Sequence, residues 1–265
     1  MIPAHLDAAG IEKTVSFLRA SKKLLFITGA GLSADSDLPT YRGVGGLYDR
    51  DNTEEGLPIE TMLSGTMMAT RPELTWKYLY EIEKACRGKT FNRGHQVIAE
   101  MEAHFKKVWV LTQNVDGFHH RAGSRAVIDI HGSLHELCCT GCQRSSRRQD
   151  YRDLPIPPHC SDCGAMLRPN VVLFGEALPY DKVAQLNRIL LEGVDLVFSV
   201  GTSSLFPYIV EPVVEAKRYG IPTVEINPGH TDISQMVDVH LASKAAETLD
   251  AIWELYRARD DGKQG

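Results

Sequence analysis

Residues 23–34 read KLLFITGAGLSA, an apolar run that passes directly into a glycine-rich turn. Lys23–Thr28 is short and rich in branched and aromatic side chains, which indicates a buried strand. Gly29–Ala34 fits the pattern G-x-G-x-x-A, whose glycines allow a tight turn and a close approach of backbone N–H groups to a pyrophosphate. Alone this pattern is weak, because an ordinary strand–helix turn also uses glycine.

A dehydrogenase would place an Asp or Glu at the end of a second strand about 20 residues later. Here an irregular stretch with Asp49 and Asp51 follows, which counts against a hydride-transfer enzyme.

Apolar, β-branched runs alternate with segments of helical period along the rest of the chain. This alternation predicts an α/β fold with a Rossmann-type parallel sheet and helices on both faces. The expected strands are Lys23–Thr28, Val108–Thr112, Ala126–Ile130, Asn170–Phe174, Leu196–Val200, Thr223–Ile226 and Val239–Ala242. The expected helices are Leu6–Ala20, Pro72–Cys86, Gly94–Phe105, Lys182–Leu191, Pro207–Tyr219 and Ala245–Ala258.

Two stretches interrupt this rhythm. Thr40 to about Arg71 is rich in Gly, Asp and Pro and is expected to be an extended loop or a small insertion, within a cofactor-loop and helical region over about 40–90. Ser133 to about Arg168 holds most of the cysteines and predicts a second insertion. We therefore expect one Rossmann-type domain from 1–132 and 169–265, with a small domain inserted at 133–168.

Four of the six cysteines form two pairs, Cys139-x-x-Cys142 and Cys160-x-x-Cys163, separated by seventeen residues. Two such pairs are typical of one structural zinc ion held by four thiolates, and they predict a zinc-ribbon-like unit. Cys138 could compete as an alternate ligand, whereas Cys86 is expected to be a buried small hydrophobe in a helix. Clustered cysteines without an evident signal peptide favour metal over disulfides and a cytoplasmic protein.

The composition excludes several classes of protein. The chain has 265 residues, of which 43% are hydrophobic and 24% charged, and this balance argues against disorder. A net charge of −5 gives no basic field to hold nucleic acid or an anionic membrane. The longest apolar runs, such as residues 171–174, are far too short to span a bilayer.

Small and hydrogen-bonding residues follow nearly every expected strand. Because ligands of open parallel sheets bind beyond the carboxyl ends of the strands, these residues predict a ligand site along one edge. His131 lies at such an end and is a candidate general base, although a lone histidine is more often structural. The five strand ends are Thr28-Gly29-Ala30-Gly31, Thr112-Gln113-Asn114, His131-Gly132, Gly201-Thr202-Ser203-Ser204 and Asn227-Pro228-Gly229.

The ordered set of these motifs resembles the sirtuins, NAD-dependent protein deacylases, in a bacterial-type single-domain form. The resemblance covers roughly residues 12–255. It is carried by Gly29-Ala30-Gly31-Leu32-Ser33, Leu38-Pro39-Thr40-Tyr41-Arg42-Gly43, Thr112-Gln113-Asn114-Val115-Asp116, His131-Gly132, the two cysteine pairs, Gly201-Thr202-Ser203 and Asn227-Pro228.

The resemblance implies a reaction in which the acyl-lysine oxygen attacks C1′ of the nicotinamide ribose and nicotinamide leaves. A histidine then activates a ribose hydroxyl, and the acyl group departs on ADP-ribose. By motif position His131 is the expected base, Asn114 holds the ribose and a water, and Asp116 holds the nicotinamide carboxamide. The implied cofactors are NAD as co-substrate and one structural zinc ion.

The resemblance also implies two sets of binding residues. The NAD set is Gly29, Ala30, Gly31, Ser33, Tyr41, Arg42, Gln113, Asn114, Val115, Asp116, Gly201, Thr202, Ser203, Asn227, Pro228, Lys244 and Ala245. The substrate set is Tyr41, His131, Val172, Leu173, Phe174, Gly175 and Glu176, of which the last five form a segment expected to pair with an extended peptide. Val172 and Phe174 are expected to wall the acyl-lysine channel.

Three positions refine the resemblance. Asp37 stands where the family usually has Gly, and Asp tolerates a positive φ better than most residues. Tyr41 replaces the commoner Phe and keeps the ring. Desuccinylating relatives carry a Tyr and an Arg where this chain has Leu79 and Ile82, so that acetyl or a longer neutral acyl group is expected.

The expected partners are proteins or peptides with acylated lysines, and the chain is expected to act as a monomer without binding membranes or nucleic acid. Two alternatives stay open. The same cleft could transfer single ADP-ribosyl groups or hydrolyse NAD, or the chain could be a non-catalytic module that recognises NAD or acylated peptides.

Overall fold

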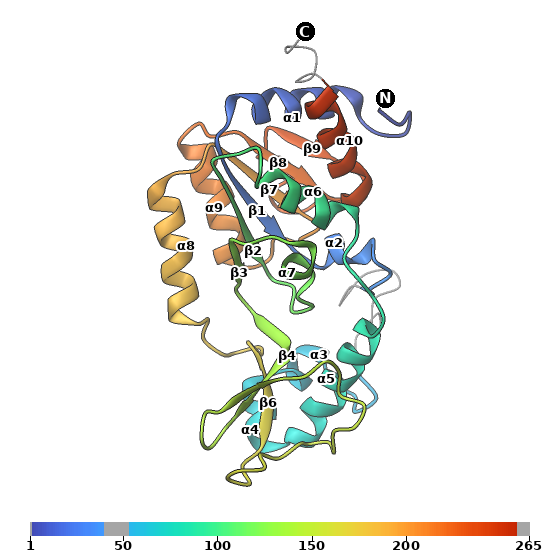
Figure 1. The fold of residues 1–265 in the computed structure, drawn as a ribbon, viewed down its shortest axis with the longest axis vertical. Coiled ribbons are helices and arrows are strands. Elements are labelled where there is room, and N and C mark those ends of the chain that lie inside the picture. Colours follow the sequence, from blue (N-terminus) through green and yellow to red (C-terminus); the bar gives the residue numbers. More distant parts are fainter. Residues whose placement is uncertain (1, 40–52, 259–265) are drawn as a thin grey trace.

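Six parallel strands form the main sheet of the computed structural model, which describes residues 2–39 and 53–258 (Figure 1). Their order is β3-β2-β1-β7-β8-β9. The register sets Thr28 beside Thr112 and Val200, so the carboxyl ends of the three central strands are level. The strands are β1 (Lys23–Thr28), β2 (Lys107–Thr112), β3 (Val127–Asp129), β7 (Leu196–Val200), β8 (Thr223–Ile226) and β9 (Val239–Leu241).

The strand order reverses between β1 and β7. From β1 the chain builds outward to β2 and β3, and it then returns to β7 on the other side of β1 and continues to β8 and β9. Loops that leave neighbouring strands on opposite sides open a crevice at such a point, where α/β sheets bind their ligands. The topology therefore places the crevice beside the glycine turn after β1.

Helices cover both faces of this sheet, and each face has its own apolar core. Leu24 and Phe26 of β1 belong to one core, whereas Leu25 and Ile27 belong to the other, as the two-residue period of a strand requires. The first core is closed by α1 (Ala8–Ala20), α6 (Arg93–Met101) and α10 (Ala245–Ala258), and the second by α8 (Tyr180–Glu192) and α9 (Pro207–Arg218). Burial on both faces explains why β1, β2 and β7 read as continuous apolar runs.

A smaller unit lies at the end of the molecule opposite the termini (Figure 1). Its three-stranded antiparallel sheet has the order β5-β4-β6, with β4 (Gly132–Cys139) between β5 (Ser145–Arg147) and β6 (Leu167–Val171). A third core joins this sheet to α3 (Ile59–Met62), α4 (Gly65–Thr70) and α5 (Pro72–Cys86). Two further short helices, α2 (Ala30–Ala34) and α7 (Phe118–Ala122), follow β1 and β2.

Most expected elements are confirmed to within a few residues, but two regions differ. The strand expected over Asn170–Phe174 is wrong in its bounds, because β6 ends at Val171 and pairs antiparallel with β4 outside the main sheet. An insertion was predicted in this region, but no strands at the positions of β4 and β5. The part of the expected loop at 40–71 that the structure describes contains the helices α3 and α4. The domain boundaries at 133 and 168 stay a prediction.

No helix in the described ranges combines the length and the apolar character needed to cross a bilayer.

Candidate active site

A cavity of about 890 Å³ lies at the carboxyl ends of β1, β2 and β7. It extends from the main sheet to the smaller unit, so that residues of both line it. Most of the predicted site residues are on its wall. These are Gly29, Ala30, Gly31, Gln113, Asn114, Val115, His131, Val172, Leu173, Phe174, Gly175, Glu176, Gly201, Thr202, Ser203 and Asn227.

The glycine turn after β1 lies against the backbone that follows β7. The N–H of Gly31 donates to the carbonyl of Gly201 over 2.8 Å, and the N–H of Gly29 donates to that of Val200 over 3.1 Å. A Cβ on Gly31 would come within 2.7 Å of Gly201 Cα, and Gly201 itself has a φ of +59°. Glycine is required here because two backbones touch, and the contact leaves this part of the wall without side chains.

Asn114 organises a buried hydrogen-bond chain behind the wall. Its Nδ2 donates to the Gly29 carbonyl and to Ser33 Oγ, each over 3.0 Å. Ser33 Oγ donates in turn to Asp116 Oδ2 over 2.7 Å, and the N–H of Phe118 donates to Oδ1 over 2.9 Å. Burial raises the pKa of Asp116, while these two hydrogen bonds oppose the shift. Ser33 and Asp116 therefore brace Asn114 and lie outside the cavity wall.

At the far side of the cavity, hydrogen bonds join the residues that follow the strands β2, β7 and β8. Gln113 Nε2 donates to Thr202 Oγ1 over 2.7 Å, and Asn227 Nδ2 donates to the Thr202 carbonyl over 2.9 Å. Besides Ser33 and Asp116, the wall does not include three further predicted members of the NAD set, Pro228, Lys244 and Ala245. Two others, Tyr41 and Arg42, lie outside the described residues.

His131 faces the cavity as a neutral imidazole of defined tautomer. Its Nδ1 lies 3.0 Å from the Gln113 carbonyl, which can only accept, so Nδ1 carries the proton. Nε2 is left with its lone pair and lies 2.6 Å from the hydroxyl of Tyr208. Burial lowers the pKa of His131, which keeps the ring neutral at physiological pH. The geometry is that of a base whose acceptor nitrogen is Nε2.

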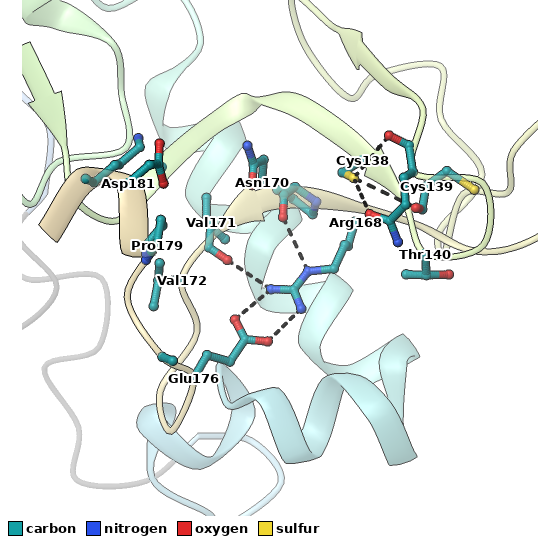
Figure 2. A pocket seen from close by; sticks show the side chains of 15 residues that line it. Cys138, Cys139, Thr140, Arg168, Asn170, Val171, Val172, Glu176, Pro179 and Asp181 are labelled. Atoms are coloured by element: carbon teal, nitrogen blue, oxygen red, sulfur yellow. Dashed lines mark hydrogen bonds and ion pairs between the residues drawn. The ribbon is translucent and has the colours of Figure 1, made fainter. Parts of the chain in front are cut away.

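The segment Val172–Glu176 crosses the cavity between the two units. The N–H of Val172 donates to the His131 carbonyl, and the N–H of Phe174 donates to that of Leu63, both over 2.9 Å. Figure 2 shows how Arg168 holds the end of the segment: its guanidinium donates to both carboxylate oxygens of Glu176, over 2.6 and 2.9 Å, and to the Val171 carbonyl. The predicted substrate segment is thus an anchored piece of backbone beside His131 that ends in a turn at Gly175, whose φ is +81°.

The end of the cavity next to the smaller unit is apolar. Leu79 and Ile82 of α5 lie on its wall, as do Leu63 and Leu134. Among the described residues, no lysine or arginine lines this cavity. A neutral, hydrocarbon group fits these surroundings better than an acid tail, which would need a cation partner.

The four paired cysteines come together in the smaller unit. The sulfur atoms of Cys139, Cys142, Cys160 and Cys163 all lie within 4.8 Å of one another. Backbone N–H groups of residues 141 and 142 point at the Cys139 sulfur over 3.4 Å. Four thiolates at these separations fit a tetrahedral zinc ion and leave no position for a water ligand. Cys138 is not part of the cluster. Cys86, expected to be buried, lies in α5 and is only partly buried against the third core.

The sequence reasoning missed the aromatic residues that follow Ser204. Phe206 and Tyr208 line the cavity, and their rings stack with centroids 5.5 Å apart. The run Leu205–Tyr208 comes directly after a strand end that was expected to bind ligand. The two aromatic residues at that place in the sequence were the available signal.

Fold and site together define a class: an α/β nucleotide-binding protein with four clustered cysteines that could hold a metal ion and a neutral histidine on the wall of the cavity at the strand ends. The model of the Sir2 family matches residues 29–207. The chain is 50% identical over 251 residues to NAD-dependent protein deacylase 2 of Pseudomonas aeruginosa, covering 93% of this chain and 98% of that protein. The chain therefore belongs to the Sir2 family.

Solved structures agree with this assignment. A Sir2 homolog–NAD complex superposes with a TM-score of 0.84 at 35% identity, over 98% of this chain and 97% of that one. A Sir2 variant bound to a deacetylated p53 peptide and 3′-O-acetyl ADP-ribose gives a TM-score of 0.82 at 26% identity, over 92% and 97%.

Proposed function

We propose that this chain removes acetyl or other neutral acyl groups from protein lysines with NAD as co-substrate, releasing nicotinamide and O-acyl-ADP-ribose. The observation that carries the proposal is the position of His131. Its unprotonated Nε2 faces one cavity that joins a glycine-lined crevice to an apolar channel. The similar Pseudomonas protein is named as a deacylase, which agrees with this chemistry.

The crevice fits NAD in two respects. The Gly29–Gly31 turn and Gly201 present bare backbone where a pyrophosphate needs a close approach. Gln113 and Asn227 add amide groups along the same wall. When bound, NAD supplies a ribose carbon with nicotinamide as its leaving group, and the protein has to orient that sugar and exclude water from it.

We assign the chemistry to three residues. His131 accepts a proton at Nε2 from a sugar hydroxyl, and the Gln113 carbonyl keeps its tautomer fixed. Asn114 positions the ribose, because its own side-chain amide is held by hydrogen bonds to the Gly29 carbonyl and to Ser33. Asp116 acts from behind the wall, where it keeps that brace rigid through Ser33.

The substrate is an extended peptide that pairs with the segment Val172–Glu176, with its acyl-lysine inserted toward His131. The apolar end lined by Leu79 and Ile82 accepts the acyl group. The p53 peptide complex of a similar Sir2 protein supports a peptide ligand for this cleft. The zinc ion is structural, since four thiolates fill its coordination shell.

We also propose that the chain works as a monomer in the cytoplasm. All the groups assigned to the site come from one chain, and a cluster of reduced thiolates suits a reducing compartment.

The test is an assay with NAD and an acetyl-lysine peptide, read by mass analysis of products. We expect one nicotinamide and one O-acetyl-ADP-ribose for each deacetylated peptide. H131A should lose at least about 100-fold in kcat, the usual contribution of a general base. H5A is the matched control, because His5 is exposed and pairs with Glu247 away from the cavity.

Other outcomes would contradict the proposal in different ways. Nicotinamide release that needs no acylated peptide would support NAD hydrolysis or ADP-ribosyl transfer. Binding of NAD without turnover on any acyl-peptide would support a recognition module. Full activity of H131A would show that His131 is not the general base.

A further inference from the structure

The hydroxyl of Tyr208 is hydrogen-bonded to the atom on which the proposed reaction depends. It lies 2.6 Å from Nε2 of His131, the nitrogen whose lone pair faces the cavity. An imidazole nitrogen has a single in-plane lone pair and accepts one strong hydrogen bond. A sugar hydroxyl can therefore reach Nε2 only after the Tyr208 hydroxyl has left it.

Neighbouring rings fix the direction of the Tyr208 side chain. Helix α9 begins at Pro207, so that Tyr208 projects from the first helical turn. Its ring stacks on Phe206 at an interplanar angle of 15°, and both rings meet the His131 ring nearly edge-on, at 80° and 86°. The hydroxyl is thus aimed at His131 by packing as well as by its hydrogen bond.

The protonation states also suit this contact. Burial raises the pKa of Tyr208 to about 12, so its hydroxyl keeps its proton at physiological pH. His131 is neutral, with its proton on Nδ1. Tyr208 therefore donates to Nε2 and stands where a donor hydroxyl of a ligand would stand.

We propose that Tyr208 is a positioning residue that latches His131 in the ligand-free protein, and that a sugar hydroxyl of the NAD-derived ligand displaces it from Nε2. The inference rests on the proposed function, because it needs a ribose ligand in this cleft. The latch keeps the imidazole turned toward the cavity before the ligand arrives. Its cost is one hydrogen bond that must be exchanged when the ligand binds.

This exchange predicts that removing the hydroxyl strengthens ligand binding. ADP-ribose is the probe, because it carries the sugar hydroxyls without a reacting bond. Y208F should bind ADP-ribose about three- to tenfold more tightly than the unaltered chain, the range expected for one net hydrogen bond. Y219F is the matched control, since Tyr219 is an exposed tyrosine at the other end of α9.

A double-mutant cycle measured by calorimetry separates a latch from a general change of shape. If Tyr208 acts through His131, Y208F should tighten binding in the unaltered chain and leave the affinity of H131A unchanged. In ligand-free protein, the ¹⁵N signal of His131 Nε2 should also move in Y208F and stay in place in Y219F.

Several results would overturn the latch. One is unchanged or weaker ADP-ribose binding by Y208F. Another is an effect of Y208F on affinity that is equally large in the H131A background. The third is a ¹⁵N chemical shift of His131 Nε2 that is the same in Y208F as in the unaltered chain. If H131A binds no ADP-ribose, the double-mutant cycle cannot be measured, and the ¹⁵N signal of His131 Nε2 in Y208F tests the latch instead. Failure of the unaltered chain to bind ADP-ribose would overturn the proposed function and the latch together. A latch that fails in a chain that does bind ADP-ribose leaves the proposed function standing.

Discussion

Asp37 occupies a backbone conformation that suits glycine. Its φ is +56°, in the left-handed region, as the glycine that the family usually has at this position suggested. The side chain is 90% exposed, and its ion pair with Lys89, at 3.5 Å, is too exposed to stabilise the turn appreciably. What makes Asp acceptable is that its short polar side chain tolerates a positive φ better than most others.

Substitutions at position 37 should therefore rank by backbone tolerance. We expect D37A to be less stable than D37G by about 1 kcal/mol, or roughly 2–4 °C in Tm, because a Cβ without a polar group is penalised at positive φ. Thermal unfolding of both variants checks this. Asp153 is the control, as an exposed aspartate without a positive φ, where the alanine variant should be at least as stable as the glycine variant. Equal Tm values for D37A and D37G would contradict the argument.

At the scale of an element, the segment Val172–Glu176 lies outside the strands of both sheets and is held by a few backbone hydrogen bonds together with one pair of side chains. Glu176 accepts two hydrogen bonds from Arg168 (Figure 2). It accepts a third from the N–H of Leu173, at 2.8 Å. The side chains of Arg168 and Glu176 are only 23% and 27% exposed. A bidentate, partly buried pair is stronger than a surface ion pair, so this one sets the shape of the segment.

Breaking the pair should weaken peptide binding without weakening nucleotide binding. We expect E176Q and R168M to raise the KM for an acetyl-lysine peptide about five- to tenfold, because a charge-assisted hydrogen bond contributes roughly 1.5–3 kcal/mol and part of it orders the segment. The Kd for ADP-ribose should stay within about twofold. R152M, which breaks the exposed Arg152–Asp150 pair, is the control. An unchanged peptide KM in both variants would show that the segment holds its shape without the pair.

The same scale shows what could be predicted from sequence. Strands β1, β2 and β7 were predicted within a residue because burial on both faces makes them apolar throughout. Strand β5 is fully exposed and β4 has a mixed pattern, so neither carries such a signal. Of the apolar residues 171–174, Val171 and Leu173 pack into the third core, but only Val171 belongs to a strand, which explains the wrong bounds predicted there.

The site was predicted where it lies at strand ends and missed where distant segments meet. Sheet topology alone brings His131, Gly29 and Thr202 together, so the strand ends were sufficient to identify them. The contact between Tyr208 and His131 joins residues 77 positions apart and depends on the orientation of α9. Local periodicity carries no information on such a contact.

At the scale of the whole molecule, the cavity lies between two bodies with separate cores. Two cores sandwich the main sheet, and a third joins α3–α5 to β4 and β6. The cysteine cluster lies in the smaller body, where Cys139 ends β4 and the chain returns through Cys160 and Cys163 to β6. Leu134, Val171 and Leu173 belong to the third core and also line the cavity.

Loss of the metal should therefore loosen one body and spare the other. Small thiolate sites commonly supply the folding energy of the unit that holds them. We expect C142S to lose its zinc by native mass spectrometry and to exchange the amide hydrogens of β4 and β6 at least about tenfold faster, because local opening follows local stability. The amides of β1 should stay protected, since its two cores contain no residue of the cluster. C138S is the control, as Cys138 neighbours the cluster without joining it. Retention of zinc by C142S, or an equal loss of protection in β1, would show that the two bodies do not depend on the metal separately.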